Sequence, residues 1–346
     1  MDRNRSLDGA RGLAALSVAL AHCATTVGGV AIYASTVRDF GSMSAGEIVL
    51  RLWHSAFNGD AAVMLFFALS GFVLGRSLER ESAPPTLALD PYLIKRAFRL
   101  LPATIFAGAF AFALEPITIQ QMIGAMFIYD NSANGVLWSL QVEVIGSILI
   151  FILWASRSRV LIAGLLIFYV YLYLRVPSFV GVVRSEFTMF PVVFILGYVV
   201  PSVPKKVWDS KVIFALGLTM LLLSDLFLGR TWHTRDGQVI GAFLVVGFLQ
   251  ANPIRFLNAR PAQFLGDVSY SFYLLHPLLL EEGVRLLNHI HLEEPLPVRA
   301  AMLALVTIPV ALALAHLVSI WIEKPGIQIG KLVVRRLREM PPTSTV

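Results

Sequence analysis

The chain has 346 residues, of which 57% are hydrophobic and 14% are charged, with a mean hydropathy of +0.73. Soluble proteins carry about 25% charged residues, so this composition excludes a disordered chain and an ordinary soluble enzyme. A net charge of +6 fits basic loops on one side of a membrane and does not by itself indicate nucleic-acid binding. The single cysteine, Cys23, excludes an internal disulfide framework and a cysteine-rich metal site.

The apolar residues predict an all-α, polytopic integral membrane helix bundle. At about 20 residues per crossing they suffice for about ten transmembrane helices. The predicted spans, in chain order, are 12–32, 61–76, 98–114, 138–155, 160–174, 187–200, 212–228, 238–250, 268–287 and 298–322. A further apolar segment, 117–129, is short, so we expect it to be either re-entrant or an eleventh span.

The distribution of Lys and Arg predicts the orientation of these spans. With the N-terminus in the cytoplasm, ten spans place 20 of the 28 Lys and Arg residues on the cytoplasmic side. This asymmetry favours an even number of spans with both termini cytoplasmic. We therefore expect a transmembrane domain over 1–330 and a basic cytoplasmic tail over 331–346, the end of which is disordered.

The first span carries two polar side chains that hydrocarbon makes costly, Arg11 and His22. Eleven residues at 1.5 Å each place His22 about 16 Å from Arg11 along the helix, near the bilayer centre. Eleven steps of 100° put both on one stripe of the helix, which Asp8 extends. The small residues on this stripe either leave room for a narrow ligand or pack against another helix. They are Gly12, Ala15 and Ala19.

Two further groups of polar residues lie at the start of the third and fourth spans. Lys95, Arg96 and Arg99 are either a topogenic anchor or a clamp for phosphate, which paired guanidinium groups bind well. Glu143 lies in an apolar span and needs a partner or a proton. A structural ion pair and a catalytic carboxylate are both consistent with its position. Ser139 precedes Glu143 by one helical turn and shares its face.

The ninth predicted span contains another histidine, His276, directly before Pro277. Proline kinks a helix, so this histidine either lines a cavity or makes a polar contact between helices. In the second span, Gly71 and Gly75 form a small-residue face that favours helix packing, although Ser70 beside them is able to point into a cavity.

Seven motifs, in this order, resemble those of the acyltransferase-3 family, membrane acyltransferases of bacterial surface polysaccharides and of some small molecules. They are Leu7-Asp-Gly-Ala-Arg-Gly12, Arg11-x10-His22, Phe66-Phe-Ala-Leu-Ser-Gly-Phe72, Lys95-Arg-Ala-Phe-Arg-Leu-Leu-Pro102, Trp138-Ser-Leu-Gln-Val-Glu143, Tyr270-Ser-Phe-Tyr-Leu-Leu-His-Pro277 and Ile322-Glu-Lys-Pro325. The resemblance covers nearly the whole chain and is strongest to the exopolysaccharide O-acetyltransferase branch. Gln141 and Ala68 depart from the family pattern, and neither change removes a titratable group.

The resemblance implies an acyl-CoA donor, usually acetyl-CoA, and a hydroxyl of a polysaccharide or lipid-linked sugar as acceptor. It also implies a multi-pass protein of a bacterial inner or plasma membrane. By motif match, His22 is the catalytic histidine and Arg11 its partner in donor binding. We expect neither a metal nor a nucleic-acid partner, and the sequence leaves the oligomeric state open.

From these expectations we assign the candidate site residues. His22 acts as general base or acyl carrier, and Glu143 or His276 orients its imidazole. The donor arm follows the small-residue stripe of the first span. The donor phosphates bind Arg11, Lys95, Arg96 and Arg99. The acceptor side consists of Ser70, Trp138, Ser139, Tyr270, Tyr273 and His276.

One alternative from another functional class is a transporter or flippase of a glycan or lipid-linked sugar. The buried His, Glu and Arg residues would then form a proton relay. Inverted repeats or paired broken helices would favour this function, and the sequence contains no convincing pair. A purely structural subunit of an export complex would leave the buried polar residues unexplained.

Overall fold

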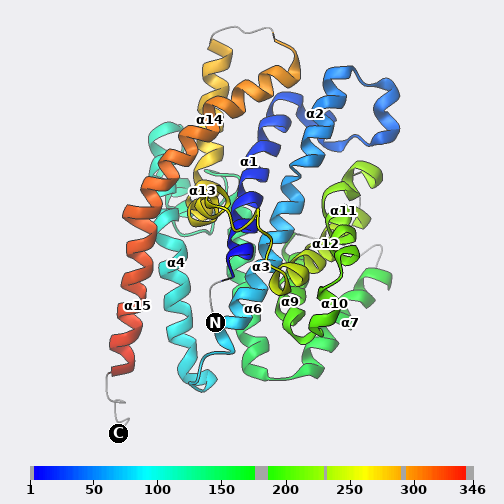
Figure 1. Ribbon diagram of the computed structural model, residues 1–346. Coiled ribbons are helices and arrows are strands. Elements are labelled where there is room, and N and C mark those ends of the chain that lie inside the picture. The colour runs from blue at the N-terminus through cyan, green and yellow to red at the C-terminus, as the bar shows by residue number, and fades with distance from the viewer. Residues whose placement is uncertain (1–3, 176–185, 230–231, 290–293, 340–346) are drawn as a thin grey trace.

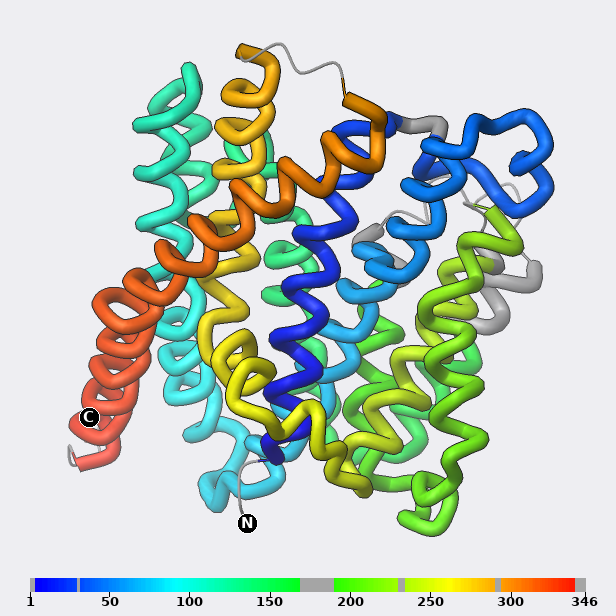
Figure 2. The backbone as a smooth tube through the Cα atoms, turned by 45° about the horizontal axis from the view of Figure 1, so that its top comes forward, coloured from blue at the N-terminus to red at the C-terminus, as the bar shows by residue number. Residues whose placement is uncertain are grey.

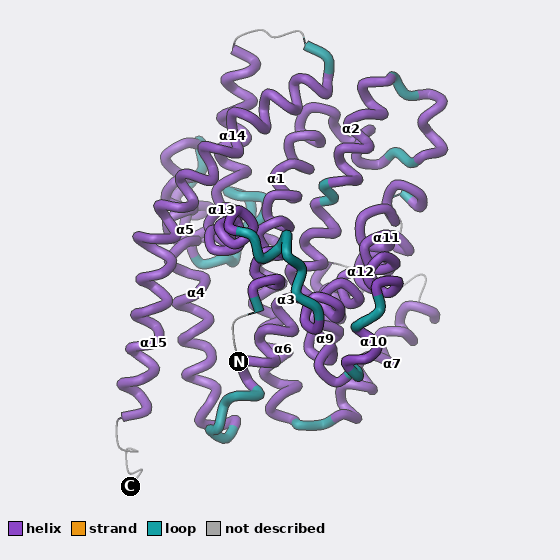
Figure 3. Tube along the Cα trace, viewed as in Figure 1, coloured by secondary structure: helices purple, strands orange, loops and turns teal. Residues whose placement is uncertain are grey.

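The computed structural model describes residues 4–175, 186–229, 232–289 and 294–339, and the statements below concern these ranges. Within them the chain forms helices joined by loops, without a strand (Figure 3). The predicted all-α fold is therefore confirmed. The predicted disorder at the end of the tail falls on residues 340–346, which lie outside the described ranges.

The helices follow the predicted spans closely, with some additions. In chain order they are α1 (Arg5–Ala34), α2 (Ala45–Ala56), α3 (Gly59–Leu78), α4 (Pro85–Leu114), α5 (Ile119–Met126), α6 (Leu137–Ser156), α7 (Arg159–Arg175), α9 (Glu186–Val199), α10 (Lys205–Trp208), α11 (Lys211–Leu228), α12 (Trp232–Ala251), α13 (Arg260–His289), α14 (Leu296–Val318) and α15 (Lys324–Glu339). The 3-10 turns Val37–Ser42 and Val200–Ser202 follow α1 and α9, and a π-helical turn, Ser319–Glu323, joins α14 to α15.

Six helical stretches of the described chain are long and apolar enough to cross a membrane. They are Arg5–Gly29, Ala45–Leu78, Pro85–Leu114, Leu137–Ser156, Lys211–Leu228 and Leu296–Glu339. Two shorter apolar helices, Arg159–Phe168 and Phe190–Ser202, coincide with the fifth and sixth predicted spans. The structure thus describes a multi-pass membrane protein, while the number of ten spans stays a prediction.

The segment 117–129 does not form an eleventh span. Its helix α5 has 8 residues, which extend over about 12 Å, and it packs against α4. Three other helices are absent from the sequence predictions, and one of them is the four-residue α10. The amphipathic helix α2 lies between the first two predicted spans, and α15 extends the last one and packs along α4 (Figure 1).

Local sequence explains how several helices begin. The Ser44 side chain accepts a hydrogen bond from the backbone N–H of Glu47 at the start of α2, and Asn58 does the same for Ala61 at the start of α3. Pro85 occupies the first turn of α4, where its missing N–H costs no helical hydrogen bond. These caps satisfy backbone donors that the membrane would otherwise leave unpaired.

Helix α1 runs through the middle of the bundle and packs most extensively against α13 and α3 (Figures 1 and 2). A Cβ atom on Gly12 would overlap the backbone of Leu265 and Gly266, so glycine allows the two helices to cross closely. Ala15 and Ala19 are almost completely buried in the core. The small-residue stripe is therefore a packing surface, and the expectation that a donor arm follows it is wrong.

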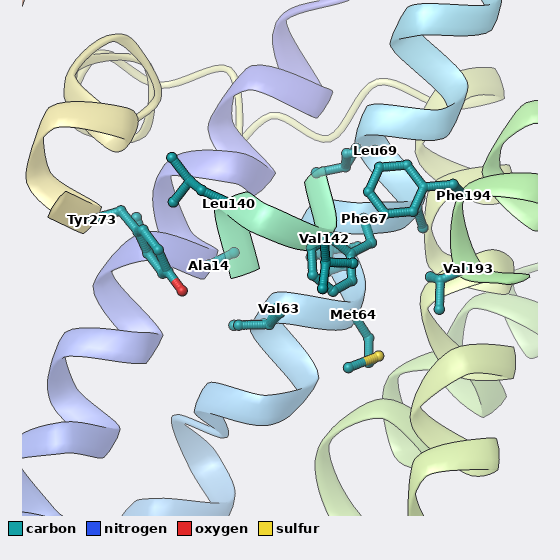
Figure 4. Close-up of a cluster of buried hydrophobic side chains, with 14 of the residues drawn as sticks. Ala14, Val63, Met64, Phe67, Leu69, Leu140, Val142, Val193, Phe194 and Tyr273 are labelled. Atoms are coloured by element: carbon teal, nitrogen blue, oxygen red, sulfur yellow. The ribbon is translucent and has the colours of Figure 1, made fainter. Parts of the chain in front are cut away.

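The predicted packing role of Gly71 and Gly75 is confirmed. A Cβ on Gly71 would overlap the backbone of Phe194, and one on Gly75 would overlap the ring of Tyr198, both on α9. Figure 4 shows the core beside this crossing, where the Phe67 ring of α3 stacks on Phe194 with centroids 5.0 Å apart. This contact fixes α3, which carries one wall of the cavities described next.

Helix α1 begins and α15 ends at the same end of the bundle, the lower end in Figure 2. We call this the basal end and the opposite one the distal end. Helices α1 and α13 both cross the bundle between the two ends. The polar residues of these helices consequently occur at different depths.

Candidate active site

Three cavities follow one another through the bundle. The basal cavity has a volume of about 990 Å³, the middle cavity about 190 Å³ and the distal cavity about 800 Å³. Arg11 and Val73 line both the basal and the middle cavity, whereas Val63 and Tyr273 line both the middle and the distal cavity. A series of adjoining cavities thus extends from the basal end to the side chains around His22.

His22 of α1 and His276 of α13 form a pair in the wall of the distal cavity. Nδ1 of His22 lies 3.1 Å from Nε2 of His276, and the ring centroids are 5.2 Å apart. Nδ1 of His276 lies 3.2 Å from the carbonyl oxygen of Phe272, one turn earlier on α13. His276 is buried, whereas His22 lines the cavity.

These contacts assign the protons of the neutral pair. A carbonyl oxygen can only accept a hydrogen bond. Nδ1 of His276 therefore carries a proton and donates a hydrogen bond to the carbonyl oxygen of Phe272. Nε2 of His276 is then an acceptor, and Nδ1–H of His22 donates to it. This hydrogen-bond network leaves a lone pair on Nε2 of His22. The arrangement is suited to a general base or a nucleophile.

Arginine–carboxylate pairs surround the middle cavity. Nη2 of Arg96 on α4 lies 2.7 Å from Oε1 of Glu143 on α6, and both side chains are mostly buried. Arg99 pairs with Glu323, which also accepts a 2.7 Å hydrogen bond from the Ser271 hydroxyl. The two arginines, adjacent on α4, therefore contact different carboxylates on different elements.

The π-helical turn places Glu323 in this network. Such turns insert one residue into a helix and often occur at functional sites. Glu323 is only 3% exposed, and its partner Arg99 stacks over the ring of Tyr270 at 5.5 Å. Glu323 is not among the site residues predicted from the sequence. Its position in the motif Ile322-Glu-Lys-Pro325, at the end of an apolar span, was the sequence feature that could have identified it as a site residue.

The structure brings most predicted site residues to the three cavities. The predicted residues of the middle cavity are Arg11, Ser70, Arg96, Arg99, Ser139, Glu143, Tyr270 and Tyr273. Lys95 lines the basal cavity, and Trp138 lines the distal cavity with His22. The Ser139 hydroxyl lies 2.9 Å from the Tyr273 hydroxyl, which connects α6 to α13.

The contacts also choose between the two predicted partners of the imidazole. His276 hydrogen-bonds His22 directly, whereas the carboxylate of Glu143 pairs with Arg96 in the middle cavity. The geometry favours His276 as the residue that orients His22. Glu143 instead fixes a guanidinium that lines the middle cavity.

The distal cavity contains polar residues that the sequence analysis does not identify. Tyr33 donates a 2.5 Å hydrogen bond to Asp60, and the ring of His54 lies edge-on to Tyr33 with centroids 5.2 Å apart. All three residues line the cavity with His22 and Trp138. The sequence signal was weak, because Tyr33 and Asp60 lie just outside predicted spans and His54 lies between two of them.

A buried ion pair stabilises the position of α2, the helix that carries His54. Arg51 of α2 is fully buried and lies 3.3 Å from Asp225 of α11. Its guanidinium also donates to the Ser55 hydroxyl and to the Ser35 carbonyl oxygen, both at 2.7 Å. These contacts attach α2, and with it His54, to the neighbouring helices.

A polytopic helix bundle with an oriented histidine beside adjoining cavities has the form of a multi-pass membrane enzyme. A family model described as an acyltransferase domain matches residues 4–316. The chain therefore belongs to the acyltransferase-3 family and is an acyltransferase. Comparisons with curated proteins and with solved structures give no match.

Proposed function

We propose that the protein transfers an acetyl group from acetyl-CoA to a hydroxyl of a surface or exported glycan, with His22 at the reacting atoms. The observation that carries this proposal is the hydrogen-bonded histidine pair. It leaves the lone pair of His22 on Nε2, next to a cavity of about 800 Å³. The family supports acyl transfer in general, and the cavities supply the arguments for donor and acceptor.

The donor approaches from the basal end in this proposal. Arg11 lines the basal and middle cavities, about 16 Å along α1 from His22. This length suits the pantetheine arm of acetyl-CoA, and Arg11, Arg96 and Arg99 bind the diphosphate of CoA as charge-assisted hydrogen-bond donors. Glu143 positions Arg96 for this contact. The arm passes Val63 and Tyr273, which line both the middle and the distal cavity.

The acceptor enters the distal cavity. Its wall offers an aromatic surface at Trp138 and hydrogen-bonding groups at Tyr33 and Asp60. A mostly apolar pocket with a few placed polar groups is typical of small-molecule recognition. Ser70, Ser139, Tyr270 and Tyr273 lie in the adjoining middle cavity, and we assign them to the passage of the thioester.

Proton transfer then proceeds through His22. Nε2 of His22 accepts the proton of the acceptor hydroxyl while the hydroxyl oxygen attacks the thioester carbonyl carbon. The carbon–sulfur bond breaks, the thiolate of CoA leaves, and the proton on the imidazolium returns to it. In a second route, Nε2 itself attacks the thioester carbonyl carbon and the thiolate of CoA leaves. The acceptor oxygen then attacks the acetyl group on Nε2, the carbon–nitrogen bond breaks, and the hydroxyl proton passes to the thiolate. In both routes His276 accepts a hydrogen bond from Nδ1–H of the reacting imidazole.

We propose ten membrane spans, with both termini and the basal cavity facing the cytoplasm of a bacterial cell. The positions of α1 and α15 support an arrangement with both termini on one side, because α1 begins and α15 ends at the basal end. The cytoplasm contains the CoA donor, and the distal cavity faces the compartment of the exported glycan. We propose residues 1–330 as the catalytic domain in this arrangement and 331–346 as a cytoplasmic tail.

The proposal is tested by mass spectrometry of surface glycans. The chromosomal gene is deleted, and the cells carry a plasmid that expresses either the unmodified protein or a variant. Removing a general base typically costs 10²- to 10⁴-fold in rate, so His22→Ala abolishes the acetyl mass increment although the protein still inserts. His316→Ala is the matched control, because His316 is exposed and lines none of the three cavities.

Two results contradict the proposal. The first is a normal acetyl content in cells that carry His22→Ala. The second is transport of a glycan by the purified protein without release of a thiol from acetyl-CoA. The second result would favour a transporter.

A further inference from the structure

Tyr273 lies where the middle cavity adjoins the distal cavity. Among the described residues, Val63 and Tyr273 line both cavities, and of these two only the tyrosine has a polar side-chain atom. The side chain extends from α13, and its hydroxyl oxygen points away from that helix (Figure 4). In the proposed function, a thioester that moves from the middle cavity to His22 passes this tyrosine.

The same residue lies beside the histidine pair. Tyr273 precedes His276 by three residues on α13, a rise of about 4.5 Å, so the two side chains share one face of the helix. Their ring centroids are 5.8 Å apart, and His276 hydrogen-bonds His22. The Tyr273 ring also packs edge-on against Phe66 of α3, with centroids 5.7 Å apart. These contacts hold the tyrosine ring next to the histidine pair.

The hydrogen bonds of Tyr273 allow its proton to be donated to a ligand. The Tyr273 hydroxyl oxygen lies 2.9 Å from Oγ of Ser139, which in turn donates to the carbonyl oxygen of Val136 at 2.9 Å. That carbonyl oxygen also accepts the backbone N–H of Ser139 at 3.2 Å. The Ser139 hydroxyl is therefore able to turn its proton to the tyrosine oxygen without leaving the carbonyl unpaired. Ser139 then donates to Tyr273, and Tyr273 donates to a group in the cavity.

Acyl transfer places negative charge on the carbonyl oxygen of the thioester. When the acceptor hydroxyl oxygen attacks the carbonyl carbon, the electron pair of the C=O π bond moves onto the carbonyl oxygen. It returns when the carbon–sulfur bond breaks and the thiolate leaves. A positioned hydrogen-bond donor stabilises this oxyanion more than it stabilises the neutral carbonyl, and it keeps its own proton throughout.

We propose that Tyr273 is a catalytic residue, whose hydroxyl donates a hydrogen bond to the carbonyl oxygen of the thioester, and that Ser139 positions this hydroxyl. The inference rests on the proposed function and adds a group that stabilises the oxyanion to the base on His22. Arg96 and Arg99 are less suited to this role, because each pairs with a carboxylate and neither lines the distal cavity. A hydroxyl pair that only connects α6 to α13 predicts no effect on kcat.

The experiment compares glycan-dependent thiol release from acetyl-CoA by the purified full-length protein and by Tyr273→Phe in detergent micelles. Phenylalanine retains the ring that packs against Phe66 and His276, and only the hydroxyl is lost. Removing one oxyanion donor costs about 10²- to 10³-fold in kcat, so we expect kcat to fall about 10²-fold. KM for acetyl-CoA should be unchanged, because the lost interaction is strongest in the transition state. Ser139→Ala should lower kcat by at most about tenfold, the value of one neutral hydrogen bond.

A second measurement separates a catalytic role from a packing role. The acetyl carbonyl of acetyl-CoA, labelled with ¹³C, absorbs infrared light at a lower frequency when it accepts a hydrogen bond. We expect the band of bound acetyl-CoA to lie at a lower frequency on the unmodified protein than on Tyr273→Phe. Tyr198→Phe is the matched control, because Tyr198 packs against Gly75 and lines none of the three cavities. This variant should retain both kcat and the band position.

Three results overturn the inference and leave the proposed function intact, because His22→Ala tests that function separately. The first is a kcat of Tyr273→Phe within a few-fold of that of the unmodified protein. The second is an equal band position in these two proteins. The third is an equal decrease of kcat in Tyr198→Phe, which would assign the effect to packing. If the unmodified protein releases no thiol with the extracted glycan, both proposals fail.

Discussion

The basal and distal halves of the cavity series use charge in different ways. At the basal end and in the middle cavity, arginine and lysine side chains dominate, and two buried carboxylates fix two of the arginines. At the distal end, a hydrogen bond joins His22 to His276, and His276 also contacts a backbone carbonyl, beside an aromatic wall. This difference agrees with the proposed function, in which the basal half binds the phosphates of the donor and the distal half transfers a proton.

The largest effect on stability is expected where the basal half contains a buried carboxylate. Glu323→Ala leaves Arg99 and the Ser271 hydroxyl without their acceptor. Removing one partner of a buried pair costs about 3–5 kcal/mol, and we expect the lower limit because Arg99 is about one-third exposed. The midpoint of thermal unfolding in micelles measures this loss. An unchanged midpoint would show that the network does not support the fold.

In the distal half, the largest effect on the reaction is expected from His276→Phe. The ring is retained, but Nδ1–H of His22 loses its acceptor, so the imidazole is no longer held in the reactive tautomer. We expect kcat to fall about 10²-fold while KM for acetyl-CoA is unchanged. The assay measures thiol release with glycan extracted from cells that lack the gene. A rise in KM for acetyl-CoA with constant kcat would place His276 in donor binding instead.

A smaller effect is expected from Asp60→Asn, which changes the acceptor wall. Hydrogen bonds to a charged group contribute about 1.5–3 kcal/mol, so KM for the glycan should rise about tenfold while KM for acetyl-CoA stays constant. Asp90→Asn is the control, because Asp90 is exposed and lines none of the cavities. If both Michaelis constants rise together, the distinction between a donor half and an acceptor half fails at this residue.

The smallest effect is expected from an exposed pair at the basal end. Arg335 and Glu339 lie one turn apart on α15 at 2.8 Å, and both are well exposed. Such pairs contribute about 0.3–0.5 kcal/mol, so Glu339→Ala should leave the thermal midpoint nearly unchanged. This variant is the matched comparison for Glu323→Ala. A loss as large as that of Glu323→Ala would mean that burial does not determine the value of these ion pairs.

The lengths of the apolar segments made most of the fold predictable. Each predicted span corresponds to a helix or to a helical stretch. The pattern of apolar residues does not predict α2, because its 12 residues mix apolar side chains with Arg51 and His54, which are buried only by tertiary contacts. It does not predict α15 either, because that helix is amphipathic and depends on packing against α4. Helices whose apolar face is narrow are visible only once their partner is known.

The identity of the site residues was more predictable than their pairing. Motif positions indicate His22, Glu143 and His276, but two residues 254 positions apart carry no local sign that they touch. Sequence reasoning consequently leaves Glu143 and His276 as equal candidates for orienting the imidazole. The small residues of α1 are equally ambiguous, because a channel and a close helix crossing require the same side chains.

The central claim is that the lone pair of His22 on Nε2 accepts the acceptor's proton. The most direct measurement is the rate of glycan-dependent thiol release from acetyl-CoA by the purified protein and by His22→Ala, at saturating acetyl-CoA. The account predicts a rate at least about 10²-fold lower for the variant, with CoA binding by calorimetry unchanged. A rate within a few-fold of the unmodified protein would contradict it.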